Sequence, residues 1–394
     1  MSKHLPQIAL LIESSRNYGR GVLRGIARYA HAHGPWSFFV QERELHSGIP
    51  KWLKNWKGDG IIARIENRGM AAQLLKLKCP VVDVLGSFRF QRVPAFDTDA
   101  MAVAKMAADF FLKAGFKHFA FSGYQGIPFS DRRAAAFAKY LAENGRQVRE
   151  MPAVPGVGEP VDIQTIEQHG MMSDQVTAHW LNAQPHPLAV LACNDVRAQQ
   201  ILNACRKHNI RVPEEMAVLG VDNDDVLCNL CDPPLTSIEP NTDLLGYEAA
   251  AALAQAMAGK RVSAQFTQLA PLRLLERAST DVIAMDDLVM VQAVRFIRHE
   301  VGSGIAVKDV LAHVRRSRTD LEQRFRRWLG TGIHSHIEHR RLERVCQLLL
   351  ETKYNLDEVA RRAGFTTAAH LCRLFKKNFQ QTPTQFRRGA RKVV

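Results

Sequence analysis

Two groups of side chains in this 394-residue chain have the types and spacing expected for ligand recognition. The first group follows short apolar segments, near points where buried strands are expected to end. Its members are Ser14, Arg16, Arg133, Asn194 and Asp222. Carboxylate, guanidinium and amide groups can together pair with sugar hydroxyls, each of which donates and accepts a hydrogen bond. The group therefore predicts a site for an uncharged, polyhydroxylated ligand, although Asn and Asp at such points also cap helices.

The second group lies in the last 110 residues and has the chemistry of DNA recognition. Arg318, Gln323 and Arg373 can form bidentate hydrogen bonds with base edges in a major groove. The expected base-reading positions are Arg318, Thr319, Glu322 and Gln323 in one segment, and Ala368, Ala369, His370 and Arg373 in another. The cations expected to contact phosphates are Arg315, Arg316, Arg326, Arg327, Lys376, Lys377, Arg387 and Arg388. For any single arginine, a solvated surface position is the simpler interpretation.

The elements that would position the first group alternate between short apolar runs and amphipathic stretches. Strands are expected at 8–12, 37–40, 60–63, 80–85, 119–122, 188–192 and 216–220, and a helix at 18–31. Apolar strands separated by helices indicate parallel sheets that are covered on both faces. Two such series predict two lobes, with ligands binding at the carboxyl ends of the strands.

The elements that would position the second group form an internal repeat. Residues 309–329 and 358–379 each predict a short helix, a turn and a longer helix, joined by a helix over 334–351. Their core positions recur at a shift of fifty, with Leu321 and Phe325 in the first unit matching Leu371 and Phe375 in the second. Ser317, and either Thr366 or Thr367, are expected to cap the longer helices. Each longer helix would enter a major groove.

Charge supports a polyanionic partner for this repeat. The formal net charge is +14, and residues 281–394 carry 22 Lys and Arg against 12 Asp and Glu. Residues 1–280 carry 31 against 27, so most of the basic excess lies in the last part of the chain. The apolar fraction of 46% and charged fraction of 23% are typical of globular proteins.

An enzyme is the main competing class, and the motifs do not favour it. The chain has no phosphate-binding loop, no dinucleotide-binding glycine pattern after a strand and no nucleophile elbow. Cys228 and Cys231 have the spacing of a metal or redox pair, but no second pair completes a zinc site. We expect no cofactor and no metal. The seven scattered cysteines and the short first apolar run predict a cytoplasmic protein without a membrane span.

The segments C-N-D-V-R-A-Q-Q (193–200) and L-G-V-D-N-D-D (219–225) resemble the sensor domains of LacI-type repressors and periplasmic sugar-binding proteins. That resemblance implies a periplasmic-binding-protein-like fold, with sugar contacts at Arg133, Asn194 and Asp222. It also implies a sensor over 1–280, with lobe one at about 1–97 and 241–268 and lobe two at about 98–240 and 269–280. The chain begins at the first strand, without the N-terminal DNA-binding headpiece of LacI-type repressors.

The segments H-R-R-L-E-R-V-C-Q-L-L-L-E-T (339–352) and A-G-F-T-T (363–367), and the ending T-P-T-Q-F-R (382–387), resemble AraC-type regulators. This resemblance implies a linker at 281–288 and an all-α DNA-binding domain with two helix-turn-helix units at 289–394. The first turn departs from the family pattern, because Arg315 and Arg316 stand where a glycine and an apolar residue are usual. An arginine in a left-handed turn costs about 1 kcal/mol, unless the turn itself differs.

The combination of these two domain types resembles the xylose operon regulators. It implies a sequence-specific DNA-binding transcription regulator of a sugar-utilisation operon, with xylose or a related aldose as the effector. The expected partners are double-stranded operator DNA, the sugar, a second copy of the chain in a homodimer and RNA polymerase. The alternative is a DNA-binding regulator whose sensor only dimerises or binds a ligand other than a sugar.

Overall fold

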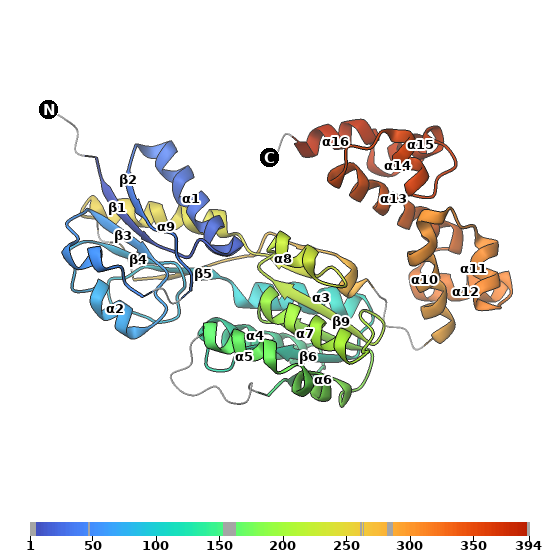
Figure 1. Cartoon of the computed structure of the whole chain (residues 1–394), viewed down its shortest axis with the longest axis horizontal. Coiled ribbons are helices and arrows are strands. Elements are labelled where there is room, and N and C mark those ends of the chain that lie inside the picture. Colours follow the sequence, from blue (N-terminus) through green and yellow to red (C-terminus); the bar gives the residue numbers. More distant parts are fainter. Residues whose placement is uncertain are drawn as a thin grey trace. The chain divides into compact units, whose positions relative to one another are not determined.

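The computed structural model describes residues 5–45, 48–152, 163–260, 262, 264–281 and 287–391. The chain divides into two compact units, residues 1–284 and 285–394, which we call unit 1 and unit 2 (Figure 1). Most of the linker that the sequence predicts at 281–288 lies outside the described residues, because 282–286 are not among them.

Unit 1 contains two six-stranded sheets, each of which forms the centre of one lobe. The sheet of lobe one has the order β11 (Phe266–Leu269), β5 (Ala95–Thr98), β4 (Val81–Asp83), β3 (Gly60–Ala63), β1 (Gln7–Leu11) and β2 (Ser37–Val40). The sheet of lobe two has the order β12 (Arg273–Leu275), β10 (Thr236–Glu239), β9 (Met216–Val221), β8 (Leu188–Ala192), β6 (His118–Ser122) and β7 (Val148–Glu150). Every described pair is parallel except β10 with β12. The two parallel-sheet lobes that the sequence predicts are therefore confirmed, with one antiparallel pair at the edge of the lobe-two sheet.

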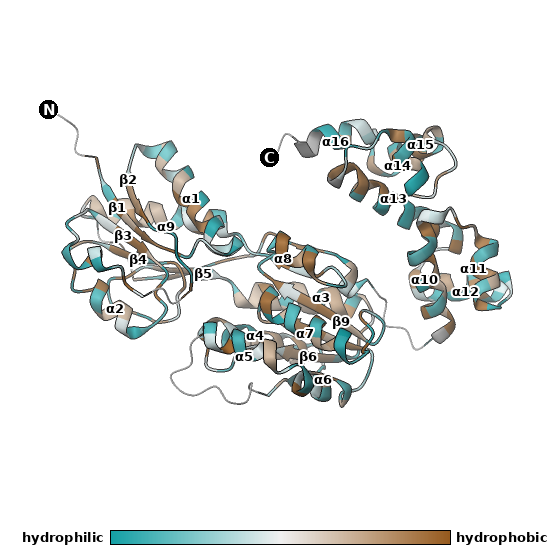
Figure 2. Ribbon diagram, viewed as in Figure 1, coloured by the Kyte–Doolittle hydropathy of each residue, from teal (hydrophilic) through white to brown (hydrophobic). Residues whose placement is uncertain are grey.

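Helices cover both sheets. Lobe one carries α1 (Asn17–His33), η1 (Lys51–Asn55), α2 (Arg68–Leu74) and α9 (Thr242–Met257). Lobe two carries α3 (Ala100–Lys113), α4 (Pro128–Glu143), α5 (Ile163–Met172), α6 (Asp174–Asn182), α7 (Asp195–Lys207), α8 (Asp225–Leu230) and η2 (Ala278–Thr280). The central strands are brown with apolar residues in Figure 2, and every residue of β8 and β9 is buried, as strands covered on both faces require.

The expected strands of unit 1 and the helix over 18–31 are confirmed with small shifts at their ends. β5, β7, β10, β11 and β12 were missed, because they are short and lack a continuous apolar run. β11 is far along the chain yet pairs with β5, so the chain returns to lobe one after building most of lobe two.

Unit 2 is all-α in its described part. Its elements are α10 (Leu288–Glu300), η3 (Val301–Ser303), α11 (Val307–Val314), α12 (Arg318–Leu329), α13 (Ile333–Glu351), α14 (Leu356–Arg362), α15 (Ala368–Phe379) and α16 (Pro383–Arg391). Leu321 and Phe325 on α12, and Leu371 and Phe375 on α15, are buried, which confirms the repeat's core positions. No described helix is long and apolar enough to cross a membrane.

Local sequence fixes the start of both longer helices. Ser317 Oγ accepts a hydrogen bond from the backbone N–H of Asp320 at 3.3 Å, and Thr367 Oγ1 accepts one from His370 at 3.1 Å. These bonds confirm the expected N-caps and select Thr367 over Thr366. Arg315 ends α11 in the left-handed region, with φ 53° and ψ 48°. The turn therefore keeps the geometry usual for glycine, although an arginine occupies it.

Candidate functional site

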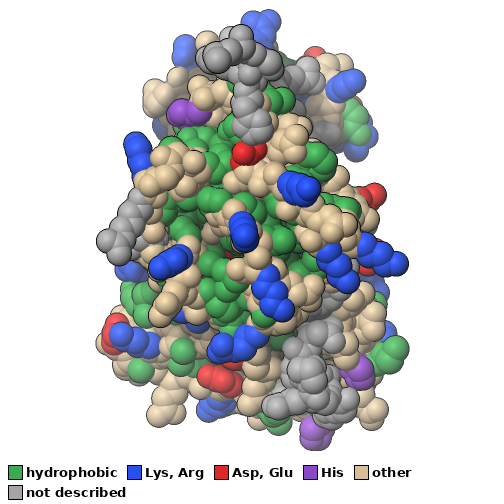
Figure 3. Space-filling model, turned by 90° about the vertical axis from the view of Figure 1, so that its left-hand side faces the viewer, with side chains coloured by type: hydrophobic (Ala, Val, Ile, Leu, Met, Phe, Trp, Pro, Cys, Tyr) green, Lys and Arg blue, Asp and Glu red, His purple; other side chains and the backbone are tan. Residues whose placement is uncertain are grey.

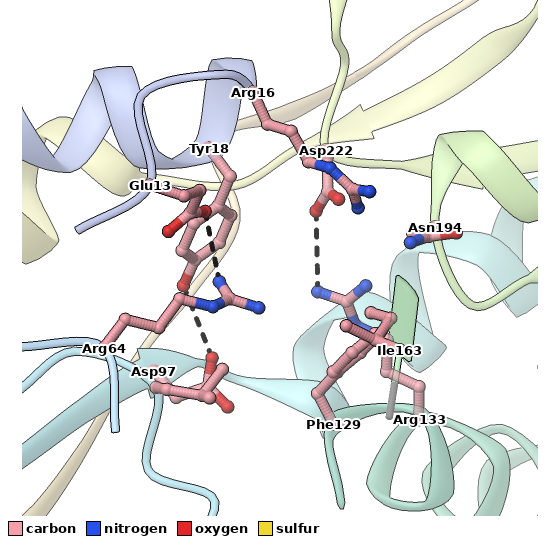
Figure 4. A pocket seen from close by; sticks show the side chains of 11 residues that line it. Glu13, Arg16, Tyr18, Arg64, Asp97, Phe129, Arg133, Ile163, Asn194 and Asp222 are labelled. Atoms are coloured by element: carbon pink, nitrogen blue, oxygen red, sulfur yellow. Dashed lines mark hydrogen bonds and ion pairs between the residues drawn. The ribbon is translucent and has the colours of Figure 1, made fainter. Parts of the chain in front are cut away.

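A small cavity of about 30 Å³ lies between the two lobes of unit 1 (Figure 4). Lobe one contributes Glu13, Arg16, Tyr18, Arg64, Leu85 and Asp97, and lobe two contributes Phe129, Arg133, Ile163, Asn194 and Asp222. Both lobes therefore supply charged side chains to one site. A molecule bound there would contact both lobes at once, so its binding would depend on how closely they approach.

The ends of parallel strands position most of these side chains. Glu13 and Arg16 follow β1, Arg64 follows β3, and Asp222 follows β9. Asn194 is the N-cap of α7, and its Oδ1 accepts a hydrogen bond from Arg197 N at 2.9 Å. Its Nδ2 points toward Glu167 and the cavity, so this residue both caps a helix and lines the site. Asp222 has a φ of 117°, a region that non-glycine residues rarely occupy and that is often associated with functional sites.

Ion pairs and hydrogen bonds connect the lining residues within each lobe. In lobe one, Arg64 Nη1 lies 3.3 Å from Glu13 Oε1, and Tyr18 Oη donates to Asp97 Oδ1 at 3.4 Å. In lobe two, Arg133 Nη2 lies 3.8 Å from Asp222 Oδ1, and its Nη1 donates to the carbonyl of Cys193. Figure 4 shows these pairs facing one another across the site.

The lining is electrically balanced. Its charged members are three arginines (Arg16, Arg64, Arg133) and three carboxylates (Glu13, Asp97, Asp222). Burial raises the pKa of Asp222, and the neighbouring arginines, Arg133 foremost, lower it in turn. A site with balanced charges and many donors and acceptors suits a neutral ligand that carries hydroxyl groups.

Glu167 on α5 extends this network and joins the lobes. Arg16, from lobe one, donates to both oxygens of Glu167, with an Nη1–Oε1 distance of 3.0 Å. Asn194 Nδ2 donates to the same Oε1 at 3.4 Å. Glu167 is 7% exposed, so the carboxylate side of this bidentate pair is largely shielded from water, whereas the Arg16 side chain is 29% exposed. Glu167 therefore orients two of the lining residues that the sequence predicted.

Further polar contacts cross between the lobes. Arg132 of α4 donates to Asp97 Oδ2 at 2.6 Å and to the carbonyl of Gly86 at 3.3 Å. Asn17 at the start of α1 donates through its Nδ2 to the carbonyl of Asn223 at 3.0 Å, and its backbone N–H reaches Asp224 at 3.2 Å. The lobes are thus held together by polar groups at several points around the cavity.

The structure brings together four of the five residues predicted for ligand binding: Arg16, Arg133, Asn194 and Asp222. Ser14 is placed elsewhere, because its Oγ accepts a hydrogen bond from Arg43 N at 3.2 Å and it is not among the lining residues. Arg64 directly follows a predicted strand, so a search for polar side chains at the carboxyl ends of all predicted strands would have found it. Asp97 and Glu167 lie within elements that the sequence did not delimit.

Unit 2 presents the first group of predicted DNA-contacting residues on α12 and the turn before it. Arg318, Thr319 and Gln323 are exposed, as are Arg315, Arg316, Arg326 and Arg327, whereas Glu322 is half-buried. Their exposure follows from the helix period, because Leu321 and Phe325 turn the opposite face inward. The exposed face therefore carries most of the side chains that the sequence predicts to read bases and to contact phosphates.

α15 presents the second group in the same way. Ala369, Arg373, Lys376 and Lys377 are exposed, and Ala368 and His370 are half-buried. The His370 ring lies 5.5 Å from that of Phe365 in an edge-on contact. On α16, Arg388 is exposed, but Arg387 is half-buried and its Nε donates to the carbonyl of Leu349 at 3.2 Å. Arg387 thus also ties α16 to α13.

Among the described residues, no group of three His, Cys, Asp or Glu side chains is arranged to hold a metal ion. Cys228 and Cys231 are buried in the apolar core of lobe two, and the thiol of Cys228 lies 3.4 Å from Asp195 Oδ2. Burial raises the pKa of both thiols, which disfavours the thiolate form that metals bind.

Three family models match successive parts of the chain. The XylR N-terminal domain matches residues 7–102, the periplasmic binding protein-like domain matches 108–280, and a helix-turn-helix domain matches 310–389. The two-lobed fold of unit 1 and the paired helix-turn-helix units of unit 2 agree with these matches.

Similarity to individual proteins extends over the whole chain. The xylose operon regulatory protein of Haemophilus influenzae is 30% identical, over 98% of this chain and 99% of that protein. The protein of the same name from Escherichia coli strain K12 is also 30% identical, over 97% of this chain and 96% of that protein. A solved structure of the xylose-binding transcription activator xylR has a TM-score of 0.74 and 28% identity, covering 98% of this chain and 99% of that one. These relatives are transcription regulators and not enzymes, and the chain belongs to the family of xylose operon regulatory proteins.

Proposed function

We propose that xylose, or a related aldose, binds between the two lobes of unit 1 and thereby controls how unit 2 binds operator DNA. The chain is a DNA-binding, sugar-responsive transcription regulator by family, and the proposal concerns the identity of the sugar, the residues and the mechanism. The observation that carries it is the cavity itself, in which three arginines, three carboxylates and an amide from both lobes converge. The names of the relatives support xylose as the first candidate.

In this proposal the sugar hydroxyls are contacted by four residues that the sequence predicts, which are Arg16, Arg133, Asn194 and Asp222. Glu13, Arg64 and Asp97, which also line the cavity, contact them as well. Phe129 offers an apolar ring face to the C–H groups of the sugar. The cavity of about 30 Å³ holds on the order of two water molecules, so a pentose requires side chains or lobes to shift. The ion-paired Arg16, whose side chain is 29% exposed, is the best placed to move.

Sugar binding can bias the regulator only by the difference in its affinity for two arrangements of the lobes. A tenfold difference corresponds to about 1.4 kcal/mol, which is within reach of a few hydroxyl contacts made from both lobes. The same difference must reach unit 2 as a change in how well its helices fit DNA.

For DNA recognition, α12 and α15 enter successive major grooves about one helical turn apart. Bases are read by four residues of each helix. These are Arg318, Thr319, Glu322 and Gln323 on α12, and Ala368, Ala369, His370 and Arg373 on α15. Phosphates are contacted by the exposed cations near these helices, which are Arg315, Arg316, Arg326, Arg327, Lys376, Lys377 and Arg388. The half-buried Arg387 lies at the margin of this phosphate-contacting surface. A homodimer would place two such pairs on an operator with two half-sites, where it would act with RNA polymerase in the cytoplasm.

Calorimetric titration of the full-length chain with xylose, arabinose, ribose, glucose and galactose tests the ligand assignment. We expect one aldose, with xylose first, to bind with one site per chain and to lose at least tenfold in affinity in Asn194→Ala. Glu143→Gln, an exposed position at the end of α4, serves as the control and should bind normally. If no aldose binds while DNA binding persists, the sensor would serve dimerisation or another ligand instead.

A further inference from the structure

The two faces of the lobe-one sheet are covered unequally. One face packs against α1 and α9, which have 17 and 16 residues. The opposite face is covered in its described part by η1 and α2, which have only five and seven residues. β2 alternates between these faces, with Phe38 packed toward α1 and α9 and Phe39 toward the aromatic rings of η1 and its neighbour Trp56. The short helices leave part of the second face uncovered.

Three aromatic rings form the exposed part of this face. The ring of Phe39 lies 5.0 Å from that of Trp56 and 6.3 Å from that of Trp52, and the two indoles are 5.6 Å apart. A Cβ at Gly58 would come within 2.1 Å of the Trp56 ring, so only a glycine at this position leaves room for the indole. Phe39 and Val40 are 41% and 52% exposed, although both are large and apolar. The rings of the cluster therefore contact one another but are only partly covered.

Two grooves open on this face. The first, of about 270 Å³, is lined by Phe39, Val40, Trp52, Asn55 and Trp56. The second, of about 230 Å³, is lined by Ile49, Leu53, Lys54, Gln73, Lys76 and Leu77. Each is several times larger than the cavity between the lobes, at about 30 Å³. Each groove therefore has room for a large apolar side chain of a partner.

The rim of the grooves is basic. Lys54 and Lys76 line the second groove, and Lys51, Lys57 and Lys78 stand next to lining residues in the sequence. All five lysines are exposed, and within the described parts of the chain none of them forms an ion pair. Figure 3, which views the side of lobe one on which α2 lies, shows apolar side chains gathered at the centre with Lys and Arg spaced around them. A second copy of the same face would bring five lysines against five, which disfavours a contact between two identical copies of this face.

β2 adds a further feature suited to a peptide. It is the edge strand of its sheet and pairs only with β1 among the described strands, so its other side presents backbone N–H and C=O groups. An extended segment can add to such an edge by main-chain hydrogen bonds and place alternate side chains in adjoining grooves.

We propose that this face of lobe one, formed by β2, η1 and α2, is a docking surface for an acidic segment of a partner protein that carries large apolar side chains. The apolar side chains fill the two grooves, and the carboxylates pair with the lysine rim. This interaction lies outside both the sugar site and the DNA-binding helices, so it goes beyond the proposed function and does not depend on it.

The test is fluorescence anisotropy of a labelled 14-residue peptide that alternates Asp and Glu with Leu and Phe, titrated with the full-length chain. The comparison peptide carries Lys at every acidic position. We expect binding of the acidic peptide alone, weakened by salt because Coulombic attraction is screened. The basic unit 2 can also attract an acidic peptide, so variants must locate the binding.

The triple variant Lys51→Glu/Lys54→Glu/Lys57→Glu and the single variant Phe39→Ser should each weaken peptide binding at least tenfold. The matched control Lys113→Glu/Lys139→Glu/Lys260→Glu changes the same number of exposed lysines elsewhere in unit 1 and should leave binding within twofold. All substituted positions are surface-exposed, so folding is retained, and circular dichroism verifies this. Equal effects of the two triple variants, or none from either, would overturn the proposal.

Two other occupants are distinguished in the same series. Binding of phosphatidylglycerol vesicles but not of the peptide, lost in the same variants, would identify a membrane surface and reject a protein partner. A sedimentation coefficient that falls in Phe39→Ser would identify a second copy of the chain and likewise reject the proposal.

Discussion

At the residue scale, the turn after α11 has an arginine where the backbone is left-handed. Arg315 has a φ of 53°, whereas the φ of its neighbour Arg316 is not positive. A side chain with a Cβ is disfavoured by about 1 kcal/mol in this conformation. Arg315 is exposed beside α12, so its charge can offset that cost when phosphate is bound.

Arg315→Gly should therefore stabilise unit 2 by up to about 1 kcal/mol and weaken DNA binding. Hydrogen exchange of the buried α12 amides in the full-length chain measures the stability, and binding to mixed-sequence duplex measures the affinity. Arg316→Gly is the control, since it removes the same charge without relieving a left-handed backbone and should not stabilise. A destabilised Arg315→Gly variant would contradict this account of the turn.

Arg373 and Lys376 lie one helical turn apart on α15 and should contribute differently. Arg373→Ala should cost about 1–3 kcal/mol and relax preference at one base position, because a bidentate contact is lost. Lys376→Ala should weaken all sequences alike and reduce the salt dependence, because it removes a phosphate contact. Binding to a set of single-base operator variants at several salt concentrations separates the two. Sequence-independent losses of equal size from both substitutions would refute this division.

At the element scale, the two lobes are tied by the pair between Arg16 before α1 and Glu167 on α5. Glu167 is buried, Arg16 is partly exposed, and the same carboxylate also orients Asn194. A broken pair would make lobe closure less favourable and leave Arg16 free to leave the site. The sugar would then have to provide the free energy that the pair contributes now.

Glu167→Gln should weaken sugar binding by roughly fivefold to fiftyfold, which corresponds to about 1–2 kcal/mol of lost preorganisation. Calorimetry measures the affinity, and small-angle scattering without sugar should show more open lobes. Glu143→Gln again provides a matched control on the surface of α4. Tighter sugar binding in Glu167→Gln would mean that Glu167 competes with the sugar for Arg16, against this account.

The turn between α14 and α15 depends on Gly364. It has a φ of 78°, and a Cβ there would lie 2.0 Å from the carbonyl oxygen of Val301 in η3. Gly364→Ala should destabilise unit 2 by at least about 2 kcal/mol, since it combines backbone strain with a clash. Gly330→Ala is the control, because it has a similar φ of 68° but open space around it. Equal effects of the two substitutions would mean that the contact with η3 adds nothing.

Elements with a clear period were predictable, and so were the side chains at their ends. Asn194 and Asp222 were found because they directly follow the fully apolar strands β8 and β9. Asp97 lies inside the short strand β5, and Glu167 lies in α5, so only the folded chain brings them to the site. Ser14 has the expected type and position in the sequence, but its Oγ accepts a hydrogen bond from the backbone N–H of Arg43, 29 residues later, and it does not line the cavity.

At the scale of the whole molecule, the basic charge is concentrated in the part of the chain that contains the DNA-binding domain. The excess of ten cations in residues 281–394 lies in the part of the chain that contains the helix-turn-helix units, whereas the lining of the cavity between the lobes has balanced charges. Electrostatic attraction brings unit 2 to any duplex, and the small set of base contacts then selects a sequence. In the proposed mechanism, the sugar must therefore act on the selection of a sequence by the base contacts, or on the spacing of two protomers.

Selection of random-sequence duplexes by the full-length chain, with and without xylose at moderate salt, tests the central claim most directly. The account predicts that one motif is enriched, with two contacted segments about one helical turn apart, and that xylose changes its enrichment by at least tenfold. Recovery of no preferred sequence, or of the same motif to the same extent with and without sugar, would contradict it.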